Sequence, residues 1–377
     1  MKKYRIDEIT INLDNLRKPL NNIERSKISD KKLYPYFGAN NLMDYVDEYI
    51  FDEEILCVAE DGGSWGFRER CSYIVNEKCW VNNHAHVLKA NKNLNLKFLS
   101  YYLNYNDLSS NITGTTRGKL TKSALNSIEI LLPELSEQNK IVVILDKAQS
   151  LIDKRKEQIE TCDELVKSLF YEMFGEIKKN KKNYQIKKLD DITNKITDGV
   201  HSKPNYTTDG IPFISVKDIN TSKIIFNNCK YISQEDHESY CKRCKPERGD
   251  LLYTKVGATY GIPAVVDTDK EFSLYVSVAL IKPNKDEVNS IYLRESLRSI
   301  CIKRQADNAI KGIGVPDLHL IEIKKFQIML PPLSLQNKFA AQVEKIEQQK
   351  QLLEQSLKEL ENNFNSLMQR AFKGELF

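Results

Sequence analysis

The sequence predicts an α+β protein with two similar globular domains, each followed by a long amphipathic helix. Three observations lead to this prediction. The length of 377 residues suits two or three domains that each bury a core. One motif returns after 198 residues, and apolar residues spaced alternately by three and four follow each copy. We expect the globular domains at 1–131 and 184–329, each with an antiparallel sheet and with small helices at 96–103 and 290–303, and the long helices at 132–176 and 330–377.

The repeat is clearest where each long helix is expected to begin. Segment 132–140 reads LPELSEQNK and segment 330–338 reads LPPLSLQNK. Chance could explain one such match, but further matches occur in the same order along both halves. The sequence therefore indicates an internal duplication. The other matching segments are a short strand (54–56 EIL, 250–252 DLL) and a glycine-rich loop (62–66 GGSWG, 257–261 GATYG).

Each expected helix carries one apolar stripe. Ser136 and Ser334 follow a Leu-Pro sequence and are expected to be the helix N-caps. The spacing is typical of a coiled-coil seam, and a single helix of ~40 residues cannot bury such a stripe alone. We expect the two helices to pair antiparallel within the chain; packing of each helix on its own domain and dimerisation are the alternatives. The stripes consist of Leu145, Ala148, Ile152, Ile159, Cys162, Val166, Leu169 and Met173, and of Val343, Ile346, Leu353, Leu357, Leu360, Phe364, Leu367 and Ala371.

The charge distribution favours a polyanionic partner for the domains. The formal net charge is +4, while the helical regions 132–176 and 331–377 carry −4 and 0, which leaves +8 on the rest of the chain. Basic domains joined by acidic or neutral helices suit domains that contact nucleic acid and helices that do not. Scattered surface lysines would explain this distribution as well.

The sequence also predicts where the protein is located. No apolar stretch approaches the ~18 residues of a membrane span. The N-terminal segment MKKYRID has no apolar signal-peptide core, so we expect a cytoplasmic protein without a membrane association. In that compartment the eight cysteines should be reduced thiols.

The chain resembles the specificity subunits of type I restriction-modification systems. The resemblance rests on the Leu-Pro-x-Leu-x-x-Gln-x-Lys sequence before each long helix and on the acidic strand followed by a glycine-rich loop. The order domain, helix, domain, helix covers essentially the whole chain. The resemblance implies that each domain reads half of a split double-stranded DNA target. It also implies that the helices space the halves and dock two modification (adenine methyltransferase) subunits, with restriction (translocase and nuclease) subunits joining the complex.

Catalytic motifs are either missing from the sequence or present in only one of its two repeated halves. The sequence contains neither an Asn/Asp-Pro-Pro-Tyr/Phe methyltransferase motif nor a P-loop, so we expect no enzyme activity and no cofactor. Asp317 and Glu322 resemble the carboxylates of a nuclease metal site. Their counterparts at an offset of 198 residues are Lys119 and Ala124, which cannot bind a metal ion.

A zinc site is the other alternative that the sequence raises. Cys229, His237, Cys241 and Cys244 could bind zinc, since a Cys-x-x-Cys pair chelates well. The first domain has no equivalent set, and a second Cys-x-x-Cys pair is missing. We therefore expect partly buried thiols and no metal.

Loops that combine glycine with polar and cationic residues are the candidate DNA contacts. Glycine lets the backbone approach a phosphate, while hydroxyls and cations donate to phosphates and base edges. Two loops in each domain fit, together with the extended segment 198–206, although ordinary turns with solvated lysines are the alternative for any one residue. The candidates are Ser64, Trp65, Arg68, Arg70, Thr115, Thr116, Arg117 and Lys119, and His201, Lys203, Lys255, Thr259, Tyr260 and Lys311.

The loop chemistry differs between the domains, as SWGFR at 64–68 and TYGIP at 259–263 illustrate. We therefore expect an asymmetric, bipartite target with half-sites about one helical turn apart. The competing functional hypotheses are a coiled-coil adaptor with two protein-binding heads, and a stand-alone nuclease or methyltransferase. The missing motifs disfavour the stand-alone enzymes.

Overall fold

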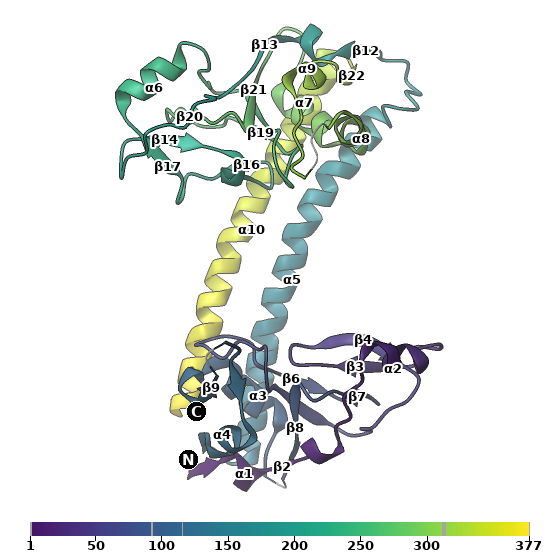
Figure 1. The fold of residues 1–377 in the computed structure, drawn as a ribbon, viewed down its shortest axis with the longest axis vertical. Coiled ribbons are helices and arrows are strands. Elements are labelled where there is room, and N and C mark those ends of the chain that lie inside the picture. The colour runs from purple at the N-terminus through teal and green to yellow at the C-terminus, as the bar shows by residue number, and fades with distance from the viewer. Residues whose placement is uncertain (1, 92, 115, 311–313, 377) are drawn as a thin grey trace. The chain divides into compact units, whose positions relative to one another are not determined.

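In the computed structural model, the chain forms two compact units (Figure 1). Unit 1 consists of residues 1–157 and 355–377, and unit 2 of residues 158–354. Each unit contains one globular part and a segment of both long helices, α5 (Leu135–Phe174) and α10 (Leu333–Lys373). The residues that the structure describes are 2–91, 93–114, 116–310 and 314–376.

Unit 1 is built around a four-stranded antiparallel sheet in the order β2-β8-β5-β6. The central strand β5 is buried along its whole length, as its unbroken apolar sequence ILCVA predicts. A second sheet has the order β4-β3-β7, and its β3–β7 pair is parallel, which differs from the expected antiparallel pairing. Two-stranded pairs β1-β11 and β9-β10 complete the unit. The strands are β1 (Lys2–Arg5), β2 (Thr10–Asn12), β3 (Tyr34–Phe37), β4 (Leu42–Val46), β5 (Ile55–Ala59), β6 (Ser72–Val75), β7 (Trp80–Val81), β8 (Ala85–Ala90), β9 (Ile112–Thr113), β10 (Lys119–Leu120) and β11 (Glu129–Leu132).

Short helices pack against the sheets of unit 1. The longest of them, α3, buries Leu96, Phe98, Leu99 and Leu103 in the core, and Asn95 caps its first turn by accepting from two backbone amides. This helix was expected at 96–103 and extends two residues further. The helices are α1 (Ile6–Ile9), α2 (Asn22–Lys27), α3 (Leu96–Tyr105), α4 (Lys122–Ser127) and the 3-10 turns Asp14–Leu16 and Ser109–Asn111.

Unit 2 repeats this topology. Its four-stranded antiparallel sheet has the order β13-β21-β18-β19, and a second sheet has the order β17-β14-β20, in which β14–β20 is again parallel. The pairs β12-β22 and β15-β16 are two-stranded. The strands are β12 (Gln185–Lys188), β13 (Thr193–Asp198), β14 (Ile211–Ile214), β15 (Ile219–Asn220), β16 (Lys223–Ile224), β17 (Lys230–Ile232), β18 (Leu251–Thr254), β19 (Pro263–Val265), β20 (Ser273–Leu274), β21 (Val278–Pro283) and β22 (Gln327–Leu330).

The helices of unit 2 include one difference from the sequence prediction. A single helix was expected at 290–303, but the chain breaks at Ser299, which has extended backbone and whose Oγ accepts from the Ile302 amide. Two helices therefore result, the second capped by this serine. The helices are α6 (Gln234–Cys241), α7 (Ser290–Arg298), α8 (Ile300–Ala309), α9 (Leu320–Ile323) and the 3-10 turns Leu189–Ile192 and Val216–Asp218.

Strand register gives the residue equivalence between the units. Leu56 lies opposite Leu88 in unit 1, and Leu251 lies opposite Ile281 in unit 2. The sequence comparison matched Leu56 with Leu252 and is wrong by one residue in this strand. A slip of one residue would turn each side chain to the other face of the sheet, so β5 and β18 correspond at an offset of 195 residues.

The repeated Gln-Asn pair of the helix motif holds each long helix on its globular part. The fully buried Gln138 donates to the carbonyls of Asn93 and Pro133 and accepts from the Asn95 amide at 2.9 Å, while Asn139 accepts from the Asn95 side chain at 2.8 Å. Buried amides must be paired in this way because an unpaired one costs ~1–3 kcal/mol. Unit 2 repeats the same bonds, with Gln336 and Asn337 in place of Gln138 and Asn139 and with Asn289 in place of Asn95.

The first turns of the long helices differ from the prediction. The helices begin at Leu135 and Leu333, so Ser136 and Ser334 lie inside the first turn and are not the N-caps. The amide of Gln138 donates to the carbonyl of Glu134, so the first helical hydrogen bond forms two residues earlier than a cap at Ser136 would place it.

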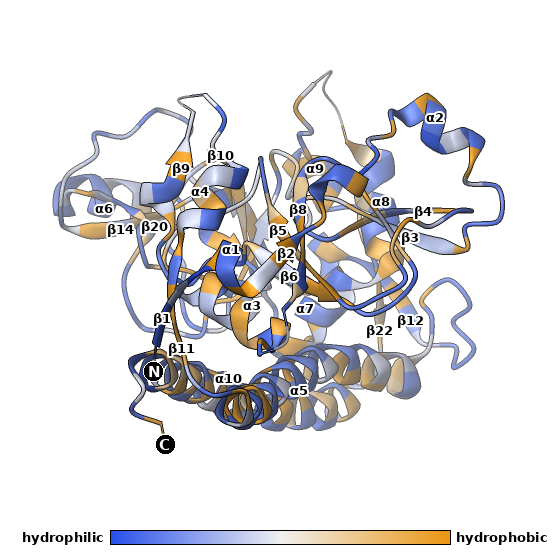
Figure 2. Cartoon of the chain, turned by 90° about the horizontal axis from the view of Figure 1, so that it is seen from below, coloured by the Kyte–Doolittle hydropathy of each residue, from blue (hydrophilic) through white to orange (hydrophobic). Residues whose placement is uncertain are grey.

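Both predicted stripes are the less exposed faces of their helices, because each of their residues is buried or partly buried. Figure 2 shows apolar residues alternating with polar ones along α5 and α10. Within unit 2, Phe174 contacts Phe339 with ring centroids 5.3 Å apart, and Asp163 pairs with Lys350 at 2.6 Å. The two helix segments of that unit therefore run in opposite directions. Within unit 1, Lys156 pairs with Glu361 at 3.4 Å.

None of the helices formed by the described residues is both long enough and apolar enough to cross a lipid bilayer.

Candidate nucleic-acid interface

The two predicted loops of unit 1 lie side by side. The Leu120 amide donates to the Glu60 carbonyl at 2.8 Å, and Asp61 and Lys119 form an isolated antiparallel bridge. Ion pairs join the same loops, since Arg117 Nη2 lies 2.9 Å from Asp61 and Lys119 Nζ lies 2.9 Å from Glu60. The structure thus brings Arg117 and Lys119 to the loop that follows β5, where each is already paired with a carboxylate.

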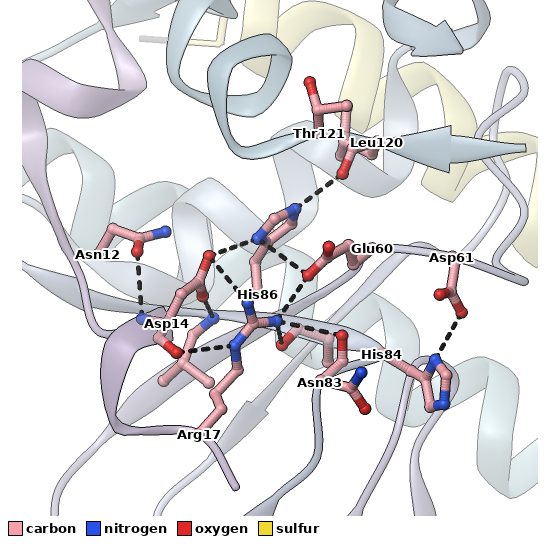
Figure 3. Close-up of polar contacts among 12 residues, drawn as sticks. Asn12, Asp14, Arg17, Glu60, Asp61, Asn83, His84, His86, Leu120 and Thr121 are labelled. Carbon is pink, nitrogen blue, oxygen red and sulfur yellow. Dashed lines mark hydrogen bonds and ion pairs between the residues drawn. The ribbon is translucent and has the colours of Figure 1, made fainter. Parts of the chain in front are cut away.

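A buried charge network supports these loops (Figure 3). Glu60 accepts from Arg17 Nη1 at 2.7 Å, and His86 Nδ1 lies 2.7 Å from an Asp14 oxygen and 3.7 Å from a Glu60 oxygen. The other ring nitrogen of His86 lies 2.8 Å from the carbonyl of Leu120, at the end of the second loop. The network therefore connects the sheet of unit 1 to the backbone of both loops.

The cations of this network keep its carboxyl groups ionised. Burial alone would raise the pKa of Asp14, but hydrogen bonds from His86 and from the Val87 amide hold that pKa below its ordinary value. Burial likewise acts to raise the pKa of Glu60, and Arg17 and Lys119 outweigh it, so the pKa of Glu60 is lowered.

Asp14, Glu60 and His86 form a donor set of a kind that binds divalent metal ions. Arg17 and Lys119 already neutralise its carboxylates and would repel a metal ion. We therefore interpret the set as a structural charge network.

The remaining candidates of unit 1 are divided between exposed and buried positions. Ser64 and Thr116 are exposed, whereas Trp65 is only 8% exposed and donates from Nε1 to the Ala59 carbonyl at 3.2 Å. A side chain buried in the core cannot stack on a base, so Trp65 supports the loop from below. Gly62 has φ of +65°, a backbone conformation that favours glycine, and its backbone lies against the guanidinium of Arg117.

Arg68 and Arg70 point to a different part of unit 1. They line a hollow of about 700 Å³ together with residues of α3 and of both long helices. The guanidinium of Arg68 lies 4.6 Å from the centre of the Phe67 ring and 5.7 Å from that of Tyr105. The structure therefore does not group these two arginines with Arg117 and Lys119. Thr115 of unit 1 and Lys311 of unit 2 lie outside the described residues.

Unit 2 repeats the loop geometry with inverted charges. The Leu318 amide donates to the Lys255 carbonyl at 2.8 Å, and Val256 and Asp317 form the isolated bridge. Lys255 thus occupies the position of Glu60, and Asp317 that of Lys119. Lys255 Nζ lies 3.9 Å from Asp317 and 3.5 Å from Asp198.

Lys255 is predominantly structural in this arrangement. Its side chain is 8% exposed, and Asp198, which it contacts, is 4% exposed. A buried ammonium group beside a buried carboxylate satisfies that carboxylate and is not positioned to neutralise a phosphate. The sequence pattern identified the lysine but gave no sign that it is buried.

Asp198 also organises the extended segment of unit 2. His201 Nε2 lies 3.1 Å from its carboxylate, and Arg243 pairs with the same group. His201 and Lys203 are exposed, and half of the Arg243 side chain is exposed as well. Arg243 was not among the candidates from the sequence, because it lies 45 residues from Asp198 and its segment suggested only a zinc site.

The last two candidates lie on the loop after β18. Thr259 is exposed, and Tyr260 donates to Asp307 of α8 at 2.6 Å while Lys303 Nζ lies 3.4 Å from the centre of its ring. Tyr260 therefore packs partly against α8 of its own unit.

The four residues considered for zinc binding, Cys229, His237, Cys241 and Cys244, make other contacts. His237 Nδ1 lies 2.9 Å from Ser273 Oγ, and Cys241 Sγ is 3.5 Å from the ring of the same histidine. Cys229 and Cys244 belong to an apolar core cluster, where burial raises the pKa of Cys244 to about 12. A thiol with this pKa stays protonated at neutral pH, which disfavours thiolate ligation.

Comparisons with known proteins agree on one family. A family model described as the type I restriction modification DNA specificity domain matches the chain twice, at residues 1–161 and 181–362. A putative type I restriction enzyme specificity subunit from Haemophilus influenzae is 27% identical and covers 91% of this chain and 86% of its own. The EcoKI specificity subunit of Escherichia coli is 24% identical, with 94% of this chain and 81% of the relative covered.

Two solved structures share the fold. The type I restriction-modification S subunit of M. genitalium has a TM-score of 0.59 at 16% identity and covers 98% of this chain and 96% of its own. A chain from a structure on complex assembly and conformational transition of the type I R-M system has a TM-score of 0.57 at 15% identity, covering 100% and 98%.

Proposed function

The chain belongs to the type I restriction-modification DNA specificity family, as its sequence-recognising and non-catalytic subunit, and we propose that each unit reads one half of a split duplex target. Charged residues on paired loops supply phosphate contacts, and exposed polar side chains supply base contacts. The observation that carries this proposal is the repeated loop geometry, in which equivalent backbone hydrogen bonds hold side chains of different chemistry. Equal scaffolds with unequal side chains are what an asymmetric bipartite target requires.

The contact set that we propose is narrower than the sequence prediction. In unit 1 it contains Ser64, Thr116, Arg117 and Lys119, which are exposed on adjoining loops. In unit 2 it contains Thr259, His201 and Lys203, joined by the half-exposed Arg243. Trp65 and Lys255 support the loops and are left out of the set because they are buried.

The long helices supply the spacing between the half-sites in this proposal. Their apolar stripes suit an antiparallel coiled coil, in which knobs of one helix fit holes of the other. Such a spacer is stiff, so it sets the number of base pairs between the half-sites. Membership of the family indicates DNA, methyltransferase subunits and restriction subunits as the partners. We propose that the DNA is double-stranded, that two methyltransferase subunits bind, and that the complex acts in the cytoplasm.

A binding experiment tests the proposed reading. The chain is assembled with its methyltransferase subunits, and methylome sequencing of a host that carries the complex supplies the target sequence. We expect tight binding to a duplex with both half-sites, and binding ~10³-fold or more weaker to a scrambled duplex at the same salt concentration. Equal affinity for the two duplexes would refute sequence recognition and favour the adaptor hypothesis.

A further inference from the structure

A third exposed loop of unit 1 adjoins the two reading loops. It is the turn between β3 and β4, whose tip consists of Asn40 and Asn41. Asn40 Nδ2 donates to the carbonyl of Gly62 at 3.1 Å, which ties the tip to the loop after β5. Both asparagines are exposed. Three loops of unit 1 therefore meet around Gly62, and only two of them carry the glycine-rich pattern that marks the candidate loops in the sequence.

The tip is held in a conformation that few residues other than glycine adopt. Asn41 has φ of +149°, and the turn is closed by a hydrogen bond of 3.0 Å from the Gly38 amide to the Asn41 carbonyl. The register shifts between Tyr36 and Phe37, so the strand is irregular just before the turn. Strained backbone and irregular strands recur where a protein must direct side chains at a ligand.

The base of the turn is fixed to the sheet. The Tyr73 hydroxyl donates to the Gly38 carbonyl, and Asn82 Nδ2 lies 3.4 Å from Met43 Sδ. Because neighbouring side chains hold the turn from two sides, its exposed amides are placed before any ligand binds. Such preorganisation lowers the entropy lost on binding.

The chemistry of the tip matches one kind of base pair. An asparagine amide can accept from N6 and donate to N7 of adenine, and apolar side chains pack on the methyl group of thymine. One amide hydrogen of Asn40 is donated to the Gly62 carbonyl, which leaves the other hydrogen and the side-chain oxygen for such a contact. Next to it, Leu42 is 44% exposed and Met43 is 57% exposed.

We propose that the Asn40-Asn41 turn is a specificity-determining element that reads an A·T base pair in the half-site of unit 1. The amide pairs with the adenine edge in the major groove, and Leu42 or Met43 contacts a thymine methyl. This inference rests on the proposed function and adds to it a named element and a base-pair class.

Unit 2 is built differently after the equivalent strand. The Asn82 amide donates to the Phe37 carbonyl at 3.0 Å, and the Tyr275 amide donates to the Ile214 carbonyl at 2.9 Å, so Phe37 and Ile214 correspond. The connection from β14 to β17 contains the 3-10 turn Val216–Asp218 and the pair β15-β16, in place of the short turn between β3 and β4. The Asn40-Asn41 turn is therefore a feature of unit 1 that the described part of unit 2 does not repeat.

The test compares single-base variants of the target duplex. Complexes of the methyltransferase subunits with the wild-type chain, Asn40→Ala, Asn41→Ala and the double variant are titrated with duplexes in which each A·T pair is replaced in turn by G·C. A matched control is Asn22→Ala, an exposed asparagine of α2 in the same unit. Thermal unfolding of each variant checks that the fold is retained.

We expect the double variant to bind the target ~10- to 100-fold more weakly and to lose discrimination at one A·T pair of one half-site. The Asn22→Ala variant should keep wild-type affinity and discrimination. If the double variant discriminates at every A·T pair as the wild type does, the turn does not read bases, while the proposed function stands. If the wild type itself prefers no sequence, the proposed function fails first.

Discussion

Glu60→Gln tests whether the buried charge network stabilises unit 1. The side chain of Glu60 is 13% exposed and lies 2.7 Å from Arg17 Nη1 and 2.9 Å from Lys119 Nζ. Glutamine keeps the size but removes the charge, so two charge-assisted contacts weaken. Arg17 retains the Ala85 carbonyl at 2.6 Å, and Lys119 is half exposed. The expected loss is therefore ~1–2 kcal/mol, below the value for a pair left without any partner.

The assay uses the tryptophans of the chain. Trp65 and Trp80 are its only two, and both are buried in unit 1, so their fluorescence follows the unfolding of that unit. A loss of ~1.5 kcal/mol with a urea m-value of ~2 kcal/mol/M lowers the midpoint by ~0.7 M. The control Glu48→Gln changes an exposed glutamate of the same unit and should shift the midpoint by less than ~0.2 M.

The pH dependence gives a second criterion. The pKa of Glu60 is lowered in the folded protein, so its stabilising effect is present above the ordinary value of 4.5 and is lost as the pH falls through the lower folded value. A protonated glutamate resembles glutamine, so the gap between wild type and Glu60→Gln should narrow below pH 4.5. A gap of zero at pH 7, or an equal gap at both pH values, would refute the role of this carboxylate.

The remaining predictions concern the loops and the helix motif. Lys255→Met should destabilise unit 2, as measured by hydrogen exchange, and leave the salt dependence of DNA binding unchanged. Arg117→Ala should instead lower the magnitude of the slope of log binding constant against log salt concentration by ~0.9. The opposite pattern would make Lys255 the phosphate contact. Gln138→Ala should cost ~1–3 kcal/mol in the tryptophan-detected unfolding of unit 1, because it leaves buried backbone groups unpaired. Gln336→Ala should cost as much in unit 2 with little change in tryptophan fluorescence, and equal midpoints for Gln138→Ala and wild type would exclude the anchoring role.

The sequence predicted the parts of the fold that depend on local patterns. Spacing of apolar residues identified the stripes on both long helices, and the repeat at 198 residues aligned Gln138 with Gln336. The role of those glutamines was not predictable, because their partners Asn95 and Asn289 are more than 40 residues away and carry no matching spacing. The break at Ser299 was also hard to predict, because a serine in a helical pattern can lie inside the helix as well as cap a new one.

The site was harder to predict because burial and pairing depend on long-range contacts. Composition identified Lys255 and Trp65 as candidate contacts, yet both are buried, and nothing in the neighbouring residues distinguishes a buried lysine from an exposed one. Asn40 is exposed but was not a candidate from the sequence. Its significance comes from a hydrogen bond to Gly62, which lies 22 residues further along the chain.

The inverted charges explain how two units with one scaffold can carry different loops. Backbone hydrogen bonds of 2.8 Å, from Leu120 to Glu60 and from Leu318 to Lys255, do not depend on side-chain identity and hold both loops in place. Each side-chain pair then needs only to be complementary in charge. Glu60 pairs with Lys119 in unit 1, and Lys255 pairs with Asp317 in unit 2.

A loop exchanged between the units breaks this complementarity. A graft that brings Asp317 into unit 1 places a carboxylate against Glu60, and the reverse graft places Lys119 against the buried Lys255. Like charges at this distance are destabilising, most strongly where the side chains are buried. We therefore expect a loop graft to lower the unfolding midpoint of the recipient unit unless the residue after β5 or β18 is exchanged with it. Equal midpoints for both kinds of graft would show that the backbone bonds alone position the loops.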